Sequence, residues 1–401
     1  MINLGTNIQI KNNETQGKIK IFLVLDTFKL LGGAEIQAIQ LAKYINETEK
    51  FYAQIIGFGD PGHVSKICDE NNIVWKNIRS PWSNISILRY FKLKKFGIII
   101  RKLKPDILIS YCTWPNIFCG LTWQSTGAQL FIWNQRDILS DIVDSSLERK
   151  SIENASLIVS NSEIGKNYLI NRYGILSSKI EVIRNSIQLK DIKWDRKQWR
   201  NYLGADESSL IICMVANLTN YKDHVTLLHA WDLILKKFEN NTIPRIKLVL
   251  AGNYWESYPV LIKLIDDLDI QNFVKFLGPV DDISGLLSAT DIGVLSSLSE
   301  GCPNVILEYM ASGLPLVATD IPGIREILPE HQLPYLSPPR DPSLFAELLV
   351  KLMNDISLRQ KIGKANTVFV YNNFNRDILN KYYLDLIMKN LESDMKRDTI
   401  R

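Results

Sequence analysis

Histidine, cysteine and long apolar runs are scarce in this chain of 401 residues, and each scarcity excludes a class of protein. The 4 histidines are scattered, and none has the i, i+4 spacing of a helical metal site. The 5 cysteines form no C-x-x-C pair, their number is odd, and most lie in apolar, strand-like runs. We therefore expect buried free thiols in a reducing compartment, without a disulfide framework or a metal site.

No apolar segment approaches the length of a membrane span. The first apolar run, residues 21–25, ends at Asp26, which makes it too short for a signal core or a transmembrane helix. The net charge of +4 is small for this length and does not indicate a nucleic-acid partner. We expect a cytoplasmic protein that binds no nucleic acid, and its location is compatible with a peripheral position on the inner membrane face.

Strand-like and helix-like patterns alternate along most of the chain. Buried strands are predicted at IKIFLVLD, AQIIGFG, DILISYC, LFIWNQ and SLIVSN, and in a second series at SLIICMVAN, KLVLAG, VKFLG, DIGVLSS and PLVAT. Amphipathic segments separate them, such as the helix whose apolar face carries Ala38, Leu41, Ala42 and Ile45. This alternation predicts an α/β protein with parallel sheets covered by helices on both faces.

The two series of strands predict two Rossmann-like domains. A polar, charged stretch from about Ile187 to Asp206 interrupts the pattern, and we interpret it as a linker. The predicted division is a mobile tail at 1–16, an N-terminal domain at 17–190, a C-terminal domain at 191–375, and a helix and tail at 376–401 able to pack back on the N-terminal domain. Parallel sheets bind ligands at the carboxyl ends of their strands, so facing domains would form an interdomain cleft.

The most informative segment is Ser296–Leu328. A strand ends there, Glu300 and Gly301 form a turn, Pro303 suits a helix start, and the helix ends at Gly313. Amides at such a start attract anions and hydroxyl oxygens, and a carboxylate accepts hydrogen bonds from vicinal sugar hydroxyls. A lone E-x7-E pair would favour the alternative of a surface turn and a solvated helix residue. The surrounding glycines and prolines favour a binding site instead.

The same segment closely resembles the donor-binding signature of the retaining GT-B glycosyltransferases of family four, E-x7-E within E-G-x-P-x-x-x-x-E. Further features follow in the family's order, and the resemblance covers nearly the whole chain after the tail. They are Gly32-Gly33-Ala34-Glu35, KPDIL at 104–108, WNQRD at 133–137, VIRNS at 182–186, ANLTNYKDH around Lys222, AGN at 251–253 and FLG at 276–278.

The resemblance implies a GT-B fold and transfer of a sugar, with retention, from a nucleoside-diphosphate sugar. It assigns Glu308 to the donor ribose, Glu300 to the transferred sugar and Lys222 to the diphosphate, with Glu300 and Lys222 as the catalytic pair. A cation near the departing diphosphate makes chemical sense because negative charge grows there. The implied donor-binding set is Gly33, Asn217, Lys222, Glu300, Gly301, Cys302, Pro303, Asn304, Val305 and Glu308.

Two positions depart from the family pattern. Asn217 stands where an arginine is usual, and Tyr111 stands near the place of a common histidine. Arg136 is a candidate for a compensating charge, with a structural ion pair as the alternative. We expect Gly32, Tyr111 and Arg136 on the acceptor side, and the acceptor to be a glycan or a lipid-linked intermediate of cell-surface glycan synthesis.

Neither a cofactor nor a metal ion is expected. Asp267-Leu268-Asp269 has the form of a metal-binding D-x-D, but it follows an amphipathic helix and is interpreted as the solvated end of that helix. Gly32 and Gly33 make only half of a dinucleotide fingerprint, so we interpret them as a glycine loop.

Residues 85–104 form the densest basic segment, with seven lysines and arginines, no acidic residue, and interspersed Tyr90, Phe91 and Phe96. Such a segment suits anionic lipid headgroups, and the alternative is a surface helix with solvated charges. Three rivals to sugar transfer remain open at this point. They are a nucleotide-sugar epimerase, a non-catalytic GT-B binding protein and, more distantly, a dinucleotide-dependent oxidoreductase.

Overall fold

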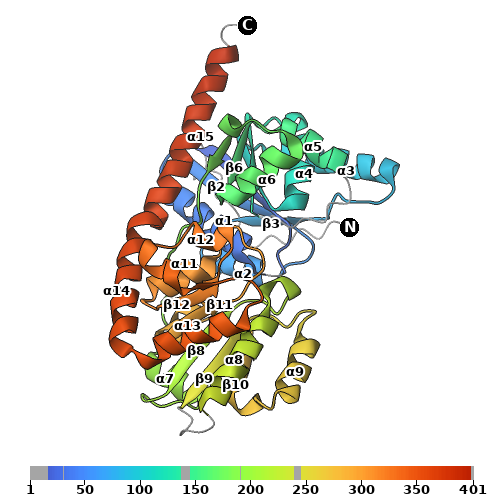
Figure 1. Cartoon of the computed structure of the whole chain (residues 1–401). Helices are drawn as coiled ribbons and strands as arrows, with labels where there is room; N and C mark the ends of the chain where they lie inside the picture. The colour runs from blue at the N-terminus through green and yellow to red at the C-terminus, as the bar shows by residue number, and fades with distance from the viewer. Residues whose placement is uncertain (1–16, 30, 137–144, 190, 239–244, 399–401) are drawn as a thin grey trace. The chain divides into compact units, whose positions relative to one another are not determined.

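The computed structural model describes residues 17–29, 31–136, 145–189, 191–238 and 245–398 (Figure 1). The chain divides into two compact units. Unit 1 runs to Asn185 and resumes at Arg376, and unit 2 is Ser186–Asn375. The sequence-based division had placed these boundaries at 190/191 and 375/376, and the tail predicted at 1–16 lies outside the described residues.

Within the described part of unit 1, seven strands form one parallel sheet in the order β3-β2-β1-β4-β5-β6-β7. The strands are β1 (Ile19–Leu25), β2 (Phe51–Phe58), β3 (Trp75–Ile78), β4 (Ile107–Tyr111), β5 (Leu130–Gln135), β6 (Leu157–Ser160) and β7 (Ile180–Val182). Ile21 of β1 lies opposite Ala53 of β2 and Ile107 of β4. The strand order therefore reverses between β1 and β4, the point at which open α/β sheets bind ligands.

Helices cover both faces of this sheet, as the alternating pattern predicts. They are α1 (Gly33–Asn46), α2 (His63–Glu70), α3 (Ser86–Leu103), α4 (Thr113–Thr122), α5 (Ser145–Glu153), α6 (Glu163–Tyr173) and α15 (Arg376–Asp398), with short 3-10 turns at Trp123–Ser125 and Ser177–Lys179. One apolar cluster joins α1, α2 and the last helix, α15, and Tyr383 and Ile387 of α15 are buried in it. A second cluster on the opposite face includes Phe96 and Ile100 of α3 and Phe118 of α4.

The described residues of unit 2 contain six strands in one parallel sheet, ordered β10-β9-β8-β11-β12-β13. They are β8 (Leu210–Val215), β9 (Ile246–Ala251), β10 (Val274–Gly278), β11 (Ile292–Leu295), β12 (Leu316–Thr319) and β13 (Leu336–Ser337). Cys213 of β8 pairs with Val249 of β9, and Ile212 pairs with Ile292 of β11. The reversal between β8 and β11 repeats the one in unit 1.

The helices of unit 2 follow the same alternation. They are α7 (Arg196–Leu203), α8 (His224–Phe238), α9 (Tyr258–Asp267), α10 (Ile283–Ala289), α11 (Asn304–Ala311), α12 (Pro322–Arg325), α13 (Pro342–Asn354) and α14 (Ile356–Asn373), with 3-10 turns at Asn220–Lys222, Gln271–Phe273 and Glu330–Tyr335. Asp267 ends α9 and pairs with Lys263 on the same helix, as expected for a solvated helix end.

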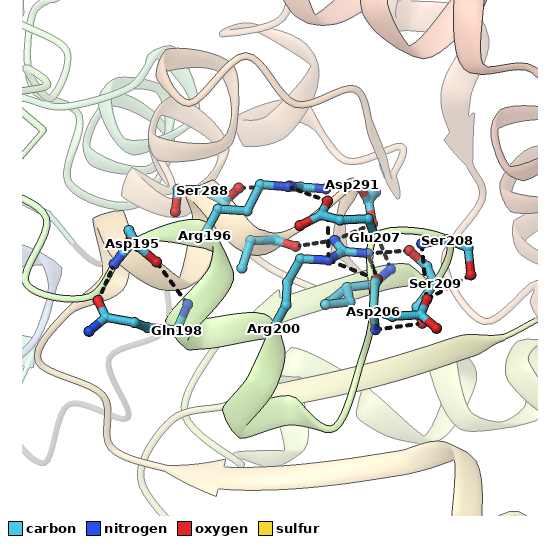
Figure 2. A network of polar contacts seen from close by, with 12 residues as sticks. Asp195, Arg196, Gln198, Arg200, Asp206, Glu207, Ser208, Ser209, Ser288 and Asp291 are labelled. Atoms are coloured by element: carbon cyan, nitrogen blue, oxygen red, sulfur yellow. Dashed lines mark hydrogen bonds and ion pairs between the residues drawn. The ribbon is translucent and has the colours of Figure 1, made fainter.

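The interpretation of residues 187–206 as a linker was wrong for its second half. Residues 196–203 form α7, which buries Trp199, Arg200 and Leu203. The fully buried Arg200 donates to the backbone oxygens of Asp206 and Ala289 and to the carboxylate of Asp291 (Figure 2). Arg200 is therefore buried with hydrogen-bond partners for its charge. The charged composition of this stretch did not mean that the segment lies outside the packed domain.

Two further expectations concern the chain as a whole. All five cysteines are free thiols; Cys68, Cys119, Cys213 and Cys302 are buried as predicted, whereas Cys112 is half-buried. Among the helices described here, none combines the length and apolarity that crossing a membrane requires.

Candidate active site

The strongest candidate site lies where the strand order of unit 2 reverses. Two loops meet there, the one after β8 and the one after β11. Ser296 holds them together, because its hydroxyl donates to the backbone oxygens of Lys222 at 3.1 Å and Asp223 at 2.9 Å. The amide of Leu298 also donates to the carbonyl of Tyr221 at 2.7 Å. Residues far apart in the sequence are thus fixed beside one another.

An ion pair joins the two predicted catalytic residues. Lys222 Nζ lies 2.5 Å from Glu300 Oε1, and the two side chains are only 14% and 10% exposed. The same carboxylate oxygen accepts a hydrogen bond from Ser297 Oγ at 2.6 Å. The Ser297 carbonyl in turn accepts from Thr319 of β12 at 2.7 Å. The charged pair is therefore held in place by the ends of two neighbouring strands.

The electrostatics keep this lysine charged and its neighbouring histidine neutral. Burial lowers the pKa of Lys222, but the Glu300 carboxylate and Tyr221 together more than offset this, and the net pKa is raised. Burial, with a smaller effect of Lys222, lowers the pKa of His224 to about 3. Within the described residues, neither ring nitrogen of His224 has a hydrogen-bond partner.

The backbone at Glu300 packs against residues 322–326, PGIRE, which include the short helix α12. A Cβ added to Gly323 would lie 2.1 Å from the Glu300 carbonyl oxygen and 2.4 Å from that of Gly301. Only a residue without a side chain allows this approach. Gly323 of α12 therefore allows the backbone of Glu300 and Gly301 to pack directly against this helix.

The first turn of α11 contains the remaining residues of unit 2 that are predicted to bind the sugar donor. Pro303 is the N-cap, and no side chain caps this helix start in the described structure. Cys302, Pro303 and Val305 are buried, whereas Gly301, Asn304 and Glu308 are half-buried. Asn304 and Glu308 are four residues apart and share one helix face, so the accessible groups of this segment lie on one side. Such a start is electrostatically suited to a phosphate or a hydroxyl oxygen.

Tyr309 anchors α11 to the sheet beneath. Its buried hydroxyl accepts from Val215 N at 2.9 Å and lies 3.1 Å from the carbonyl oxygens of Cys213 and Val294. The position of Glu308 thus depends on the core residue that follows it.

Asn217 has a structural role that the sequence did not predict. Its side-chain oxygen accepts from the backbone amide of Asn253 at 3.1 Å and from the Asn253 side chain at 3.0 Å. Asn217 therefore joins the loops after β8 and β9, and one of its polar atoms is already used. Its contact with a phosphate stays a prediction.

The remaining candidates belong to unit 1. Gly32 caps α1, and its amide donates to the Glu35 carboxylate at 3.1 Å, which places Gly33 at the first helical residue. The contact of Gly33 with a donor bound by unit 2 stays a prediction.

Tyr111 and Arg136 lie at the ends of neighbouring strands, β4 and β5, and contact each other. The guanidinium carbon of Arg136 is 5.2 Å from the Tyr111 ring centre. Arg136 also donates to the side-chain oxygens of Asn134, at 3.0 Å, and Asn185. Burial raises the pKa of Tyr111 to about 12, so this phenol stays neutral. Tyr111 is only 1% exposed and packs in the core, and the acceptor-side role of both residues stays a prediction.

Sequence reasoning missed Ser297, His224 and the supporting role of Gly323. Ser297 and His224 stand three and two residues from the predicted pair, so proximity in sequence was the available signal. No group of three or more His, Cys, Asp or Glu side chains able to hold a metal occurs in the portion of the chain described here.

Comparison with known proteins places the fold among known families. Two family profiles match adjoining parts of the chain, "Glycosyltransferase Family 4" at residues 31–191 and "Glycosyl transferases group 1" at residues 195–368.

Two curated relatives are similar over most of their length. The chain is 25% identical to the N-acetyl-alpha-D-glucosaminyl L-malate synthase of Bacillus anthracis, over 92% of this chain and 98% of the relative. It is 28% identical to the UDP-Gal:alpha-D-GlcNAc-diphosphoundecaprenol alpha-1,3-galactosyltransferase of Escherichia coli, over 76% of this chain and 82% of the relative.

Among solved structures, Anabaena HepE in complex with UDP-glucose shares the fold. The TM-score is 0.79 at 20% identity, covering 92% of this chain and 99% of that one. With two parallel-sheet units and both family profiles matched, the chain belongs to the group 1 glycosyltransferases of the GT-B fold.

Proposed function

We propose that this protein transfers a sugar from a nucleoside-diphosphate sugar to a glycan or lipid-linked acceptor, with retention of configuration and without a metal ion. The observation that carries the proposal is the buried Lys222–Glu300 pair at the reversal point of the unit 2 sheet. The uncapped start of α11 and the half-buried Glu308 beside it supply the further groups that a diphosphate and a ribose require.

Each side chain has one task in this proposal. Glu308 accepts hydrogen bonds from the ribose hydroxyls, and the backbone of residues 301–305 binds hydroxyl and phosphate oxygens. Lys222 faces the diphosphate, while Glu300 lies beside the transferred sugar. Ser297 donates a hydrogen bond to the carboxylate of Glu300 and so helps to hold it in place.

The reaction breaks the bond between the sugar's anomeric carbon and the diphosphate oxygen. The acceptor hydroxyl forms its new bond to the same face of that carbon, and its proton passes to the departing phosphate. Negative charge grows on the diphosphate, and the preplaced Lys222 ammonium stabilises it. Because the pKa of Lys222 is raised, this charge is present throughout the physiological range.

The acceptor class is supported by the names of relatives. The Escherichia coli relative is named for a diphosphoundecaprenol-linked acceptor and a UDP-galactose donor. We propose a lipid-linked or polysaccharide acceptor for this chain as well, and a peripheral position on an anionic membrane surface through residues 85–104.

A thermal-shift panel of nucleoside diphosphates and their sugar conjugates tests the donor assignment. A ligand that binds the folded state raises its melting temperature by mass action. We expect one nucleotide and its conjugate to stabilise the wild type, and Glu308→Ala to lose that shift. Glu347→Ala, an exposed glutamate of α13, is the matched control and should keep it.

An identical shift in Glu308→Ala and in the wild type would remove the ribose assignment. Transfer with the selected donor should persist in EDTA, and a loss that only added Mg²⁺ or Mn²⁺ restores would contradict the metal-free proposal.

A further inference from the structure

The helix α3 presents an apolar ridge to solvent, bordered on both sides by basic side chains. We propose that α3 lies flat on an anionic bilayer, with Ile87, Phe91 and Ile98 inserted among the acyl chains and the flanking lysines and arginines against lipid phosphates. The inference deepens the membrane contact proposed above, and it rests on that part of the proposed function and not on the transfer chemistry.

The inward face of α3 is fixed by packing. Phe96 and Ile100 are 2% and 0% exposed and belong to the apolar cluster that also contains residues of α4 and β4. Leu93 and Leu103 pack against the same cluster. Because these four side chains point into the domain, the opposite face of α3 is the one that faces solvent.

That opposite face is apolar along its centre. At about 100° per residue, Ile87, Phe91 and Ile98 fall within about 40° of one another and point away from Phe96 and Ile100. Their exposed fractions are 65%, 58% and 49%. Three large apolar side chains in one exposed line are unusual for a solvated helix, whose outer face is normally polar.

Basic side chains border the ridge on both sides. Lys94 and Arg101 follow one flank, Lys95 and Lys102 follow the other, and all four are exposed. No acidic residue occurs in α3. An interfacial helix buries such a ridge at the boundary between headgroups and acyl chains, while its cations meet anionic phosphates. The exposed apolar surface is extended at the helix start by Ile85, Leu88 and Tyr90.

Contacts at the start of α3 hold this end in place. The guanidinium of Arg89 lies 4.8 Å from the Trp82 ring centre, and Lys92 Nζ donates to the Trp82 carbonyl at 2.8 Å. Trp82 also packs on Trp114 of α4, with ring centres 4.3 Å apart. The ridge is therefore presented by an anchored helix, which lowers the entropic cost of insertion.

The arrangement favours a bilayer over two other occupants. A second copy of this face would bring the same rows of cations together, and like charges repel. A nucleic acid would match the basic rows but would leave the aliphatic ridge between them without a partner.

Vesicle flotation without donor or acceptor tests the proposal. The probes are vesicles of phosphatidylcholine with and without phosphatidylglycerol, at low and high salt. The apolar variant is Ile87→Ser/Phe91→Ser/Ile98→Ser, and the basic variant is Lys94→Gln/Lys95→Gln/Arg101→Gln/Lys102→Gln. The matched controls on similarly exposed positions are Val260→Ser/Ile356→Ser/Ile378→Ser and Lys197→Gln/Lys237→Gln/Lys361→Gln/Lys364→Gln.

We expect the wild type and both controls to float with anionic vesicles. The partition coefficient should fall roughly 10-fold for each apolar side chain removed and roughly 5-fold for each charge removed at low salt. High salt should weaken the wild type and leave the basic variant almost unchanged. Circular dichroism checks that each variant is folded.

Three results would overturn the proposal. The first is no flotation of the folded wild type, and the second is α3 variants that float like the controls. The third is RNA binding or self-association, measured by light scattering, that depends on α3 while flotation does not. The nucleotide-dependent thermal shift is measured on the same variants, so failure of docking and failure of donor binding are read separately.

Discussion

A bound ligand can lower the electrostatic cost of burying Lys222 and Glu300. Both side chains are largely removed from water, and the attraction between buried charges seldom exceeds the cost of their dehydration. A bound diphosphate would give the ammonium a second anionic partner and leave Glu300 free to accept from a sugar hydroxyl. Both Glu300→Gln and Glu300→Ala leave the Lys222 charge buried without a counter-charge, but the glutamine keeps an oxygen that can accept from the ammonium, so Glu300→Gln is the milder test.

His224 makes the free energy of unfolding depend on pH. Its pKa of about 3 lies below the ordinary 6.5, so the unfolded chain binds a proton that the folded protein does not. The free energy of unfolding should therefore fall as pH drops below about 6.5, by up to about 1.4 kcal/mol per pH unit from this residue.

Urea unfolding at several pH values between about 6.5 and about 5 checks this slope. His224→Leu should show a shallower dependence than the wild type. Equal slopes in the wild type and His224→Leu would contradict a buried neutral imidazole.

Gly323 gives a prediction about the Glu300 turn. In Gly323→Ala the new methyl group would collide with the carbonyl oxygens of Glu300 and Gly301, so the turn must move. We expect transfer to fall by roughly 100-fold, since displacements of about 1 Å at a catalytic group have such effects. Gly97→Ala is the matched control for activity, because the new methyl group would come close only to the hydroxyl oxygen of Ser125, which can rotate away. Unchanged kcat in Gly323→Ala would show that the position of the Glu300 turn is not critical for transfer.

At the scale of elements, α7 shows why composition can mislead. Its sequence, RKQWRNYL, carries three cations in eight residues, yet Arg200 is one of the largest fully buried side chains. Its guanidinium donates to the backbone carbonyls of Asp206 and Ala289 and to Asp291 (Figure 2). Asp291 itself accepts from the amide of Ile211 at 2.8 Å. Periodicity identified the apolar strands, but it does not reveal which charged residues find partners.

Arg200→Met should destabilise unit 2 by about 3–5 kcal/mol, because Asp291 and several carbonyls lose a buried donor. Arg245→Met is the matched control. Arg245 pairs with Asp206, but its side chain is 72% exposed, and surface pairs contribute at most about 1 kcal/mol. The melting temperatures of the two variants are compared with that of the wild type. Equal decreases in melting temperature would contradict a special role for Arg200.

The strands that sequence patterns located are mostly the central ones. Those not predicted are β3, β7 and β13, and each lies at an edge of its sheet. An edge strand is covered less completely, so it needs no continuous apolar run, as WKNI of β3 illustrates. Tertiary pairing determines these strands, and a local pattern cannot show it.

For the whole molecule, the repeated topology explains which site residues were predictable. In each unit the chain segments that follow the first and fourth strands meet where the strand order reverses, and Gly32, Lys222 and Glu300 all lie in such loops. The signature glutamates and Lys222 were visible because a motif carries them. Ser297 and Gly323 could not be predicted in this way. Ser297 acts through a hydrogen bond to Glu300 and Gly323 through a close backbone approach, and both contacts exist only in the folded chain.

The central claim is that Lys222 stabilises the charge that leaves with the diphosphate. Its most direct test is the kcat of sugar transfer at saturating donor in Lys222→Met, with Lys197→Met, an exposed lysine of α7, as control. We predict that kcat falls by roughly 100-fold or more in Lys222→Met and stays unchanged in the control. A folded Lys222→Met enzyme that turns over at the wild-type rate would contradict the account.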